Sequence, residues 1–165
     1  MDRLWAPWRI KYILSNKAGN CIFCVKPSRK GDRKRLILFR SDYSLIMLNR
    51  FPYNSGHLLV APVKHTGDLE ELTAEELNDL SVLLRKTVSL LRRAMAPQGY
   101  NIGMNIGQVG GAGFTDHLHF HVVPRWVGDT NFMPVSGETI VIPESLEETY
   151  EKLNSMLRDV KREGE

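Results

Sequence analysis

Hydrophobic residues between positions 36 and 63 fall into short runs separated by turn-forming residues, a pattern typical of β-strands. We expect strands over Leu36–Arg40, Tyr43–Asn49 and His57–Val63. Ser41-Asp42 supplies the turn chemistry of a tight hairpin between the first two strands. Pro62 predicts the end of the third strand, because proline cannot donate a hydrogen bond to the sheet.

Two later segments repeat their apolar residues at helical spacing. The first begins at a capping box, Thr73–Glu76, and ends before Pro97. A second capping box, Ser145–Glu148, predicts a C-terminal helix. The apolar stripe of the first helix is Leu77, Leu80, Leu84, Val88 and Leu91. That of the second is Leu146, Tyr150, Leu153 and Leu157.

Strict alternation returns between the two helices. Tyr100–Ile106 predicts a strand that turns Ile102, Met104 and Ile106 toward the core. A glycine-rich loop, Gly107–Gly113, then leads to a second strand, His117–Pro124, and the pair implies a hairpin. The inward positions of the second strand would be Leu118, Phe120 and Val122. The pattern as a whole predicts an α+β fold, with an antiparallel sheet of about five strands, one long helix and a C-terminal helix.

Composition limits the class of protein. The 165 residues are 42% apolar and 25% charged, which is ordinary for a single globular domain over 1–165. Within it we expect an N-terminal extension over 1–35, a core over 36–125 and a C-terminal segment over 126–165. No stretch approaches the roughly 20 apolar residues that span a bilayer, and the N-terminus lacks the pattern of a secretory signal. We expect a cytoplasmic protein without a membrane partner.

Positive charge is concentrated in one segment, Lys26–Arg40, although the formal net charge is only +3. No aromatic residues are interleaved with the charges there in the manner of a nucleic-acid groove. We therefore interpret the segment as a solvated loop and expect no nucleic-acid partner, while small phosphorylated ligands remain compatible with it.

Three histidines, His117, His119 and His121, alternate with apolar residues. Because successive side chains of a strand point to opposite faces, this spacing directs all three imidazoles to one side. A single histidine would be interpreted more simply as a packed surface residue. Three that would repel one another when charged are typical of a site that uses an anion, a metal or proton transfer.

The glycine-rich loop before the histidines sharpens this hypothesis. Gly107, Gly110, Gly111 and Gly113 permit positive φ angles and close backbone approach, so main-chain N–H groups can point at phosphate oxygens. Imidazole can attack phosphorus and form a phosphoramidate, which divides one difficult transfer into two easier displacements. The combination predicts a centre that transfers or hydrolyses nucleotidyl groups.

The segment His117–Val123 resembles the signature of the histidine triad nucleotide hydrolases and transferases. Leu48–Pro62 is similar to the nucleoside-binding segment of the branch that cleaves dinucleoside polyphosphates. Leu4–Arg9 and His121–Phe132 extend the resemblance over nearly the whole chain, to bacterial and archaeal members associated with diadenosine tetraphosphate. A loop slightly longer than in the phosphoramidate-cleaving members argues for a bulkier polyphosphate substrate.

The resemblance implies a role for each matched position. His119 would be the nucleophile that attacks the α-phosphorus, and His121 would contact the same phosphate. Asn105 would hydrogen-bond an oxygen that develops charge, and Asn49 would bind the ribose hydroxyls. His57 would support the orientation of His119, although it could equally be a hydrogen-bonded histidine at a strand edge.

One departure from the family pattern concerns the loop before the triad. Many members carry a hydroxyl or amide side chain there, whereas this chain has Gly113 followed by Phe114. Phosphate contacts from Gly111 and Gly113 would then be made by the main chain, with Thr115 as a candidate hydroxyl.

Cys21 and Cys24 have the short spacing that zinc prefers, and two cysteines in so long a chain do not make a disulfide framework. Alone, the pair is compatible with a metal site, a redox pair or two buried thiols. In the zinc-bearing members of the family the two further ligands match His65 and His117. The resemblance thus implies a structural Zn²⁺ with four protein ligands, although iron or another divalent ion would also suit the donor set.

The function implied by the resemblance is cleavage of a dinucleoside polyphosphate, such as diadenosine tetraphosphate, through a nucleotidyl-His119 intermediate that passes to water or inorganic phosphate. A regulatory protein that binds adenosine nucleotides with little turnover is the alternative, and a metal-storage or metal-sensing module is a third. Members commonly form homodimers through the long helix and a neighbouring strand, so we also expect a homodimer.

Overall fold

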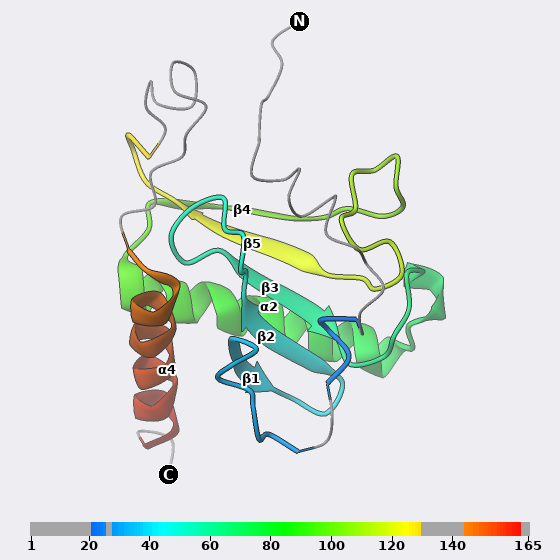
Figure 1. Cartoon of the computed structure of the whole chain (residues 1–165), viewed down its shortest axis with the longest axis horizontal. Helices are drawn as coiled ribbons and strands as arrows, with labels where there is room; N and C mark the ends of the chain where they lie inside the picture. The colour runs from blue at the N-terminus through cyan, green and yellow to red at the C-terminus, as the bar shows by residue number, and fades with distance from the viewer. Residues whose placement is uncertain (1–20, 26–27, 130–143, 163–165) are drawn as a thin grey trace, which may run out of the picture.

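A computed structural model of the chain describes residues 21–25, 28–129 and 144–162, with side chains described as far as residue 157. The predicted Leu4–Arg9 motif and the Thr130–Phe132 end of the second motif lie outside the described residues. Five antiparallel strands form one sheet in the order β1-β2-β3-β5-β4, and the long helix α2 crosses one face of it (Figure 1). The elements are β1 (Ile37–Arg40), β2 (Ser44–Leu48), β3 (Leu58–Pro62), the 3₁₀ helix η1 (Leu69–Glu71), α2 (Ala74–Met95), β4 (Gly99–Met104), β5 (Phe120–Arg125) and α4 (Leu146–Arg162).

The central strands β2 and β3 are buried along their whole length. Their alternate residues belong to two separate apolar clusters, one on each face of the sheet. On the α2 face, Ile46 and Val60 pack with the apolar residues of α2 and α4. On the other face, Met47 and Leu59 pack with Phe23, which comes from the Cys21–Cys24 segment. Among the described residues, this face is therefore covered by Cys21–Val25 and by Phe114 of the loop before β5.

Both predicted helices are confirmed. The Thr73 hydroxyl accepts a hydrogen bond from the Glu76 N–H, and the Glu76 carboxylate accepts one from the Thr73 N–H, which completes the capping box of α2. The helix ends at Met95, where Ala96 adopts a left-handed conformation with φ of 45°. Ser145 and Glu148 exchange the same pair of bonds at the start of α4.

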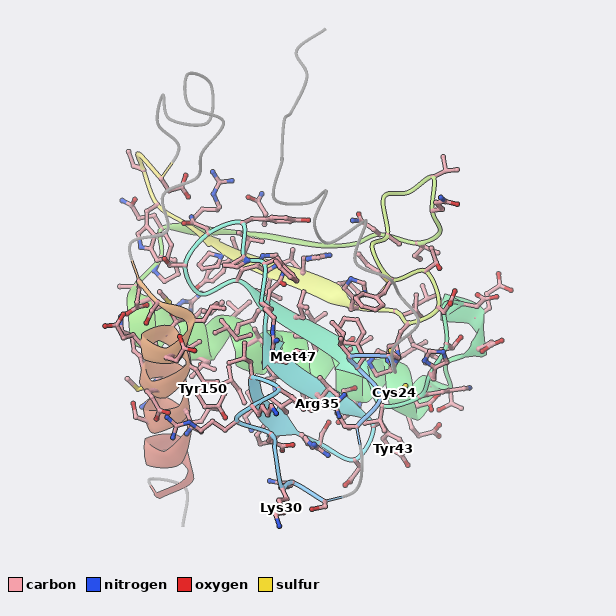
Figure 2. The ribbon with its side chains drawn as sticks, in the orientation of Figure 1. Cys24, Lys30, Arg35, Tyr43, Met47 and Tyr150 are labelled. Carbon is pink, nitrogen blue, oxygen red and sulfur yellow. The ribbon has the colours of Figure 1, made fainter. Side chains whose placement is uncertain are left out.

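Helix α4 secures the short edge strand β1. The Tyr150 hydroxyl donates a buried hydrogen bond of 3.0 Å to the Ile37 carbonyl, and Figure 2 shows its side chain directed from α4 toward β1. Arg40 at the end of β1 forms an ion pair with Asp32, and both side chains are largely buried. None of the helices in the described part of the chain is both long and apolar enough to cross a membrane.

Two expectations about the strands are wrong. The last strand begins at Phe120 and not at His117, because the Leu118 N–H donates to the Thr66 carbonyl at 2.7 Å instead of joining the sheet. Two apolar residues that alternation assigned to the core are instead exposed: Ile102 of β4 is 48% exposed, and Ile106, beyond the end of β4, is 50% exposed. Strand β4 is an edge strand, and only β5 pairs with it among the described residues.

Candidate active site and metal centre

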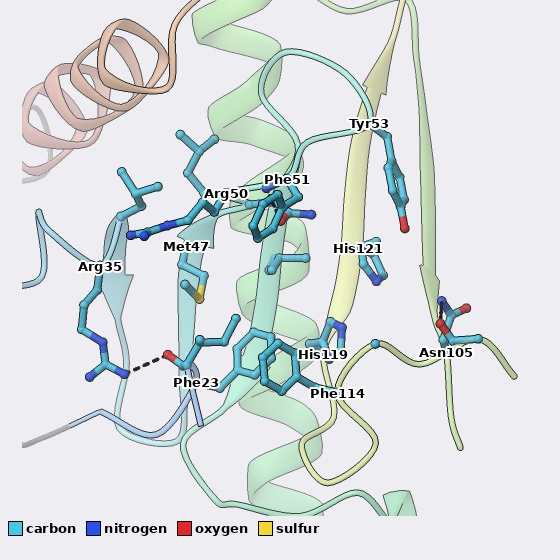
Figure 3. Close-up of a pocket in the computed structure, with 17 residues that line it drawn as sticks. Phe23, Arg35, Met47, Arg50, Phe51, Tyr53, Asn105, Phe114, His119 and His121 are labelled. Carbon is cyan, nitrogen blue, oxygen red and sulfur yellow. Dashed lines mark hydrogen bonds between the residues drawn. The ribbon is translucent and has the colours of Figure 1, made fainter. Parts of the chain in front are cut away.

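A cavity of about 360 Å³ opens on the face of the sheet opposite α2. That volume lies within the roughly 300–1,000 Å³ of small-molecule sites. It is lined by His119, His121, Asn49 and Asn105, together with Gly111 and Gly113 of the glycine-rich loop. Figure 3 shows aromatic side chains at both ends of the cavity and the two histidines on its β5 wall. The structure thus brings these six sequence-predicted residues to one site.

The hydrogen bond of one ring nitrogen of His119 determines the chemistry of the other. Its Nδ1 lies 2.9 Å from the carbonyl oxygen of His117, and a carbonyl can only accept, so the hydrogen of the neutral ring is on Nδ1. The lone pair is then on Nε2. Burial is the main cause that lowers the pKa of His119, which keeps the ring neutral near pH 7. The geometry therefore supplies an unprotonated nitrogen that can act as a nucleophile.

His121 has the opposite arrangement, and His57 is the cause. The Tyr53 N–H lies 3.1 Å from Nδ1 of His57, so that nitrogen accepts and the hydrogen of the neutral ring is on Nε2. This Nε2 lies 3.0 Å from Nδ1 of His121 and donates to it. The hydrogen of a neutral His121 is consequently on its own Nε2, where it can be donated to a ligand.

His57 is fully buried and remains neutral. Burial first, and then the neighbouring His121 and His119, lower its pKa to about 3. His57 directly precedes β3 and donates its hydrogen bond to His121, while support of the orientation of His119 stays a prediction. Its hydrogen bond to Tyr53 also ties it to the loop between β2 and β3.

The loop between β2 and β3 is also fixed by polar contacts of Asn54. The Asn54 amide donates to the Pro124 carbonyl at 3.2 Å and to the Asp129 carboxylate at 2.9 Å. Asn49 begins the loop, accepts from the Phe51 N–H at 3.0 Å and places its amide nitrogen 3.3 Å from Nδ1 of His57. Asn49 thus lines the cavity while it also orders the loop.

Backbone geometry requires glycine at three positions of the glycine-rich loop, while its contact with phosphate stays a prediction. Gly107 and Gly111 have φ angles of 71° and 86°. A Cβ atom on Gly110 would lie 2.3 Å from the Ile106 carbonyl oxygen. Asn105 donates a long hydrogen bond of 3.4 Å to the Gly111 carbonyl, drawn in Figure 3, and so connects the end of β4 to the loop. Thr115, considered as a hydroxyl for phosphate, instead donates to Asp116.

A second cluster lies behind the triad and contains Cys21, Cys24, His65 and His117. One ligand atom from each lies within 4.8 Å of all the others. Cys21 Sγ is 3.4 Å and His65 Nδ1 is 3.1 Å from His117 Nδ1, and Cys24 Sγ is 3.2 Å from His65 Nδ1. Zinc bonds of about 2.0–2.3 Å place tetrahedral ligand atoms roughly 3.3–3.8 Å apart, so the donor set fits Zn²⁺.

Contacts around the cluster orient His117 for metal binding. Its Nε2 donates to the Pro62 carbonyl at 2.8 Å, which leaves the Nδ1 lone pair directed at the two cysteines and His65. Burial lowers the pKa of His117, which favours the neutral form that ligates metals. Burial and the adjacent Cys21 raise the pKa of the Cys24 thiol, a shift that a bound cation would oppose.

Sequence reasoning missed the residues that build the cavity walls, including Phe23, Arg35 and Tyr53. Arg35 also corrects the interpretation of the basic segment as a solvated loop. Its guanidinium donates to the carbonyls of Ile22 and Cys24 at 2.9 and 2.8 Å and lines the cavity (Figure 3). The position of Arg35 directly before a predicted strand was a signal for a structural role. The chain gave no local signal for its partners.

Comparison with known proteins agrees with this geometry. The HIT domain family matches residues 30–127, more than half of the chain. A protein from Mycobacterium tuberculosis named AP-4-A phosphorylase is 34% identical over 157 residues, which cover 90% of this chain and 80% of that protein. An adenosine 5'-monophosphoramidase from Schizosaccharomyces pombe is 35% identical over 106 residues, covering 64% of this chain and 74% of that protein.

The fold has close counterparts among solved structures. A zinc-bound histidine triad family protein from Mycobacterium smegmatis superposes with a TM-score of 0.65 at 23% identity, covering 87% of this chain and 97% of that chain. At that identity the likeness concerns the fold alone. Since the family match and the M. tuberculosis relative both extend over most of the region that forms the sheet and the cavity, the chain belongs to the histidine triad, or HIT, family.

Proposed function

We propose that this HIT-family enzyme cleaves dinucleoside polyphosphates, with diadenosine tetraphosphate as the substrate, by transferring a nucleotidyl group to His119. The observation that carries the proposal is the pair of opposite tautomers at His119 and His121. One ring offers a lone pair and the next offers a hydrogen at the same wall of the cavity. The names of the M. tuberculosis and S. pombe relatives support nucleotide-cleaving activity.

In the first step the Nε2 lone pair of His119 attacks the α-phosphorus, and a bond from nitrogen to phosphorus forms. The bond between phosphorus and the bridging oxygen breaks, and the remaining nucleoside polyphosphate leaves with its electron pair. The His119 ring becomes cationic and keeps its Nδ1 hydrogen on the His117 carbonyl. The Nε2 hydrogen of His121 and the amide of Asn105 stabilise the negative oxygens.

In the second step an oxygen of water or inorganic phosphate attacks the phosphorus. The nitrogen–phosphorus bond breaks, His119 returns to its neutral form, and the proton of the acceptor passes to solvent. Diadenosine tetraphosphate would yield ATP in the first step. Water would then yield AMP, and phosphate would yield ADP.

Trapping the intermediate tests this proposal. We expect rapid acid-free quenching with radiolabelled diadenosine tetraphosphate to leave one nucleotidyl group on His119, and we expect His119→Ala to lower kcat by roughly 10⁴-fold or more. Ser81→Ala on the exposed face of α2 is the control and should retain wild-type activity. Full turnover by His119→Ala would refute the nucleophile, and binding without turnover by the wild-type protein would favour a regulatory nucleotide-binding protein.

We propose further that Zn²⁺ is held by Cys21, Cys24, His65 and His117. When bound, the metal supplies structural cross-linking, because four protein ligands leave no position for water. The convergence of four donor atoms within 4.8 Å supports this assignment.

We also propose a homodimer that uses the open edge of β4 and the neighbouring face of α2. Ile102 and Ile106 are about half exposed, and Leu77 and Val82 of α2 are also exposed. Pairing of two such edges would cover apolar side chains and satisfy main-chain groups that an open edge leaves to solvent.

A further inference from the structure

Phe23 lies between the two cysteines of the metal cluster and reaches the nucleophile. Its ring stacks on His119 with centroids 4.7 Å apart and planes inclined at 25°. It also lies 5.0 Å from the ring of His117, and its side chain is 1% exposed. A single side chain therefore contacts a metal ligand and the proposed nucleophile, and it forms part of the cavity wall.

The segment that carries Phe23 is held by side chains. Among the described residues, Cys21–Val25 belongs to no helix or strand. The thiol groups of Cys21 and Cys24 face His65 and His117, and Arg35 binds the carbonyls of Ile22 and Cys24. The two thiols and Arg35 therefore hold the segment on either side of Phe23, whose ring packs against Met47 and Leu59 of the sheet.

A third segment completes the contact. Phe114 stands in the loop before the triad. Its ring meets that of Phe23 edge-on, with centroids 5.7 Å apart. Figure 3 shows the two rings together at one end of the cavity. Both rings line the cavity. Phe114 therefore gives Phe23 a partner from the segment that joins the glycine-rich loop to β5.

We propose that Phe23 is a positioning residue that couples metal binding at the Cys21–Cys24–His65–His117 cluster to nucleotide binding in the cavity. This inference rests on the proposed function of the same cavity. A metal bound by both thiols would restrain the Cys21–Cys24 segment where it lies on the sheet and hold the ring of Phe23 against His119. A nucleotide that packs on the fixed wall stabilises the same arrangement. By linkage, each ligand then tightens the binding of the other by the same factor.

The coupling is measurable with AMP and Zn²⁺ as probes on the full-length protein. We expect AMP to bind zinc-loaded protein about tenfold more tightly than chelator-stripped protein in isothermal titration calorimetry, within the typical range of coupling between sites. Saturating AMP should raise the zinc affinity by the same factor in competition with a chromophoric chelator.

Two substitutions separate coupling from simple loss of structure. Phe23→Leu keeps an apolar side chain but removes the ring, and its ratio of AMP affinities with and without zinc should fall toward one. Phe51→Ala is the control, because Phe51 lines the cavity from the loop after β2. It should weaken AMP binding in both states and preserve the ratio. Circular dichroism and zinc content report whether each variant is folded and loaded.

Equal AMP affinity with and without zinc in the wild-type protein would overturn the inference and leave the proposed function intact. Failure of zinc-loaded wild-type protein to bind any adenosine nucleotide would overturn the proposed function itself. An unchanged ratio in Phe23→Leu would exclude Phe23 as the connection. If the stripped protein unfolds, the effect of AMP on zinc affinity decides, because Phe23→Leu should lose that effect and Phe51→Ala should keep it.

Discussion

His119 and His121 are chemically identical side chains two residues apart, and their hydrogen-bond partners make them different. A main-chain carbonyl fixes the hydrogen of one ring on Nδ1, whereas a neutral histidine fixes that of the other on Nε2. The difference originates at Nδ1 of His57, which accepts from the Tyr53 N–H. The chemistry of the site therefore depends on a residue outside the triad.

Acid should unfold the protein partly through His57. An unfolded histidine binds a proton below about pH 6.5, whereas the folded His57 has a pKa lowered to about 3. Between these values only the unfolded state is protonated, so stability is lost as the pH falls through this window. We expect the decrease in unfolding free energy from pH 7 to pH 5 to be roughly 2 kcal/mol smaller in His57→Asn than in the wild-type protein.

Urea unfolding at the two pH values measures this difference. The remaining pH dependence of the variant includes His117 and His119, because burial lowers the pKa of both. An identical pH dependence in the variant and the wild-type protein would mean that folded His57 titrates like an exposed histidine.

At this scale, sequence identified the residues that we propose to react and missed those that contact them. The alternate spacing of the triad is a local pattern, and it correctly predicted that His119 and His121 lie on one wall of the cavity. Phe23 meets His119 across 96 positions of the chain, and nothing near Phe23 in the sequence encodes that contact. Arg35 belongs to a run of basic residues, and such runs are usually exposed to solvent. The sequence therefore did not indicate its hydrogen bonds to Ile22 and Cys24.

Among the elements, the segment that carries the first two histidines of the triad is fixed by a loop. The Leu118 N–H donates to the Thr66 carbonyl, and the neighbouring Gly67 lies against the backbone of Thr115. This contact places His117 and His119 before the strand begins. Periodicity predicts the side to which they point. It cannot predict the hydrogen bond from Leu118 to Thr66, about 50 residues away in the chain, because of which β5 begins only at Phe120.

Gly67→Ala should disturb this contact. The added Cβ would lie 2.3 Å from the Thr115 carbonyl oxygen, so one of the two backbones must move. We expect a loss of about 1–3 kcal/mol in the free energy of unfolding, measured in urea. Gly99→Ala is the matched control, because a Cβ there meets no atom within 4 Å and φ is not positive. Equal free energies of unfolding for the two variants would show that the loop can shift to accept the Cβ atom without loss of stability.

At the scale of the whole molecule, the sheet is covered on both faces at its centre and open at β4. Helix α2 packs on β2, β3 and β5, while Ile102 of β4 remains half exposed beyond it. Alternation in the sequence predicted the face of Ile102 and could not reveal that the helix ends its coverage one strand earlier. The exposure of this residue in one chain is consistent with the dimer expected from the resemblance.

Ile102→Asp should therefore shift the protein from dimer to monomer. A charge at the centre of the open edge would be costly to bury against a second copy. Analytical ultracentrifugation at micromolar concentration measures the mass directly. Tyr43→Asp, an exposed residue beside the opposite edge of the sheet, is the control and should leave the mass unchanged. A monomeric wild-type protein would refute the proposed dimer.

The two separate contacts of His117 have a consequence for how the site can evolve. Its imidazole faces the metal cluster, yet the group that sets the hydrogen of His119 is its carbonyl oxygen. A carbonyl is present in every amino acid, so a mutation at this codon that preserves the backbone path can abolish a metal ligand without erasing the nucleophile. The metal centre and the catalytic step can thus be lost or acquired on separate evolutionary occasions, although a single residue serves both.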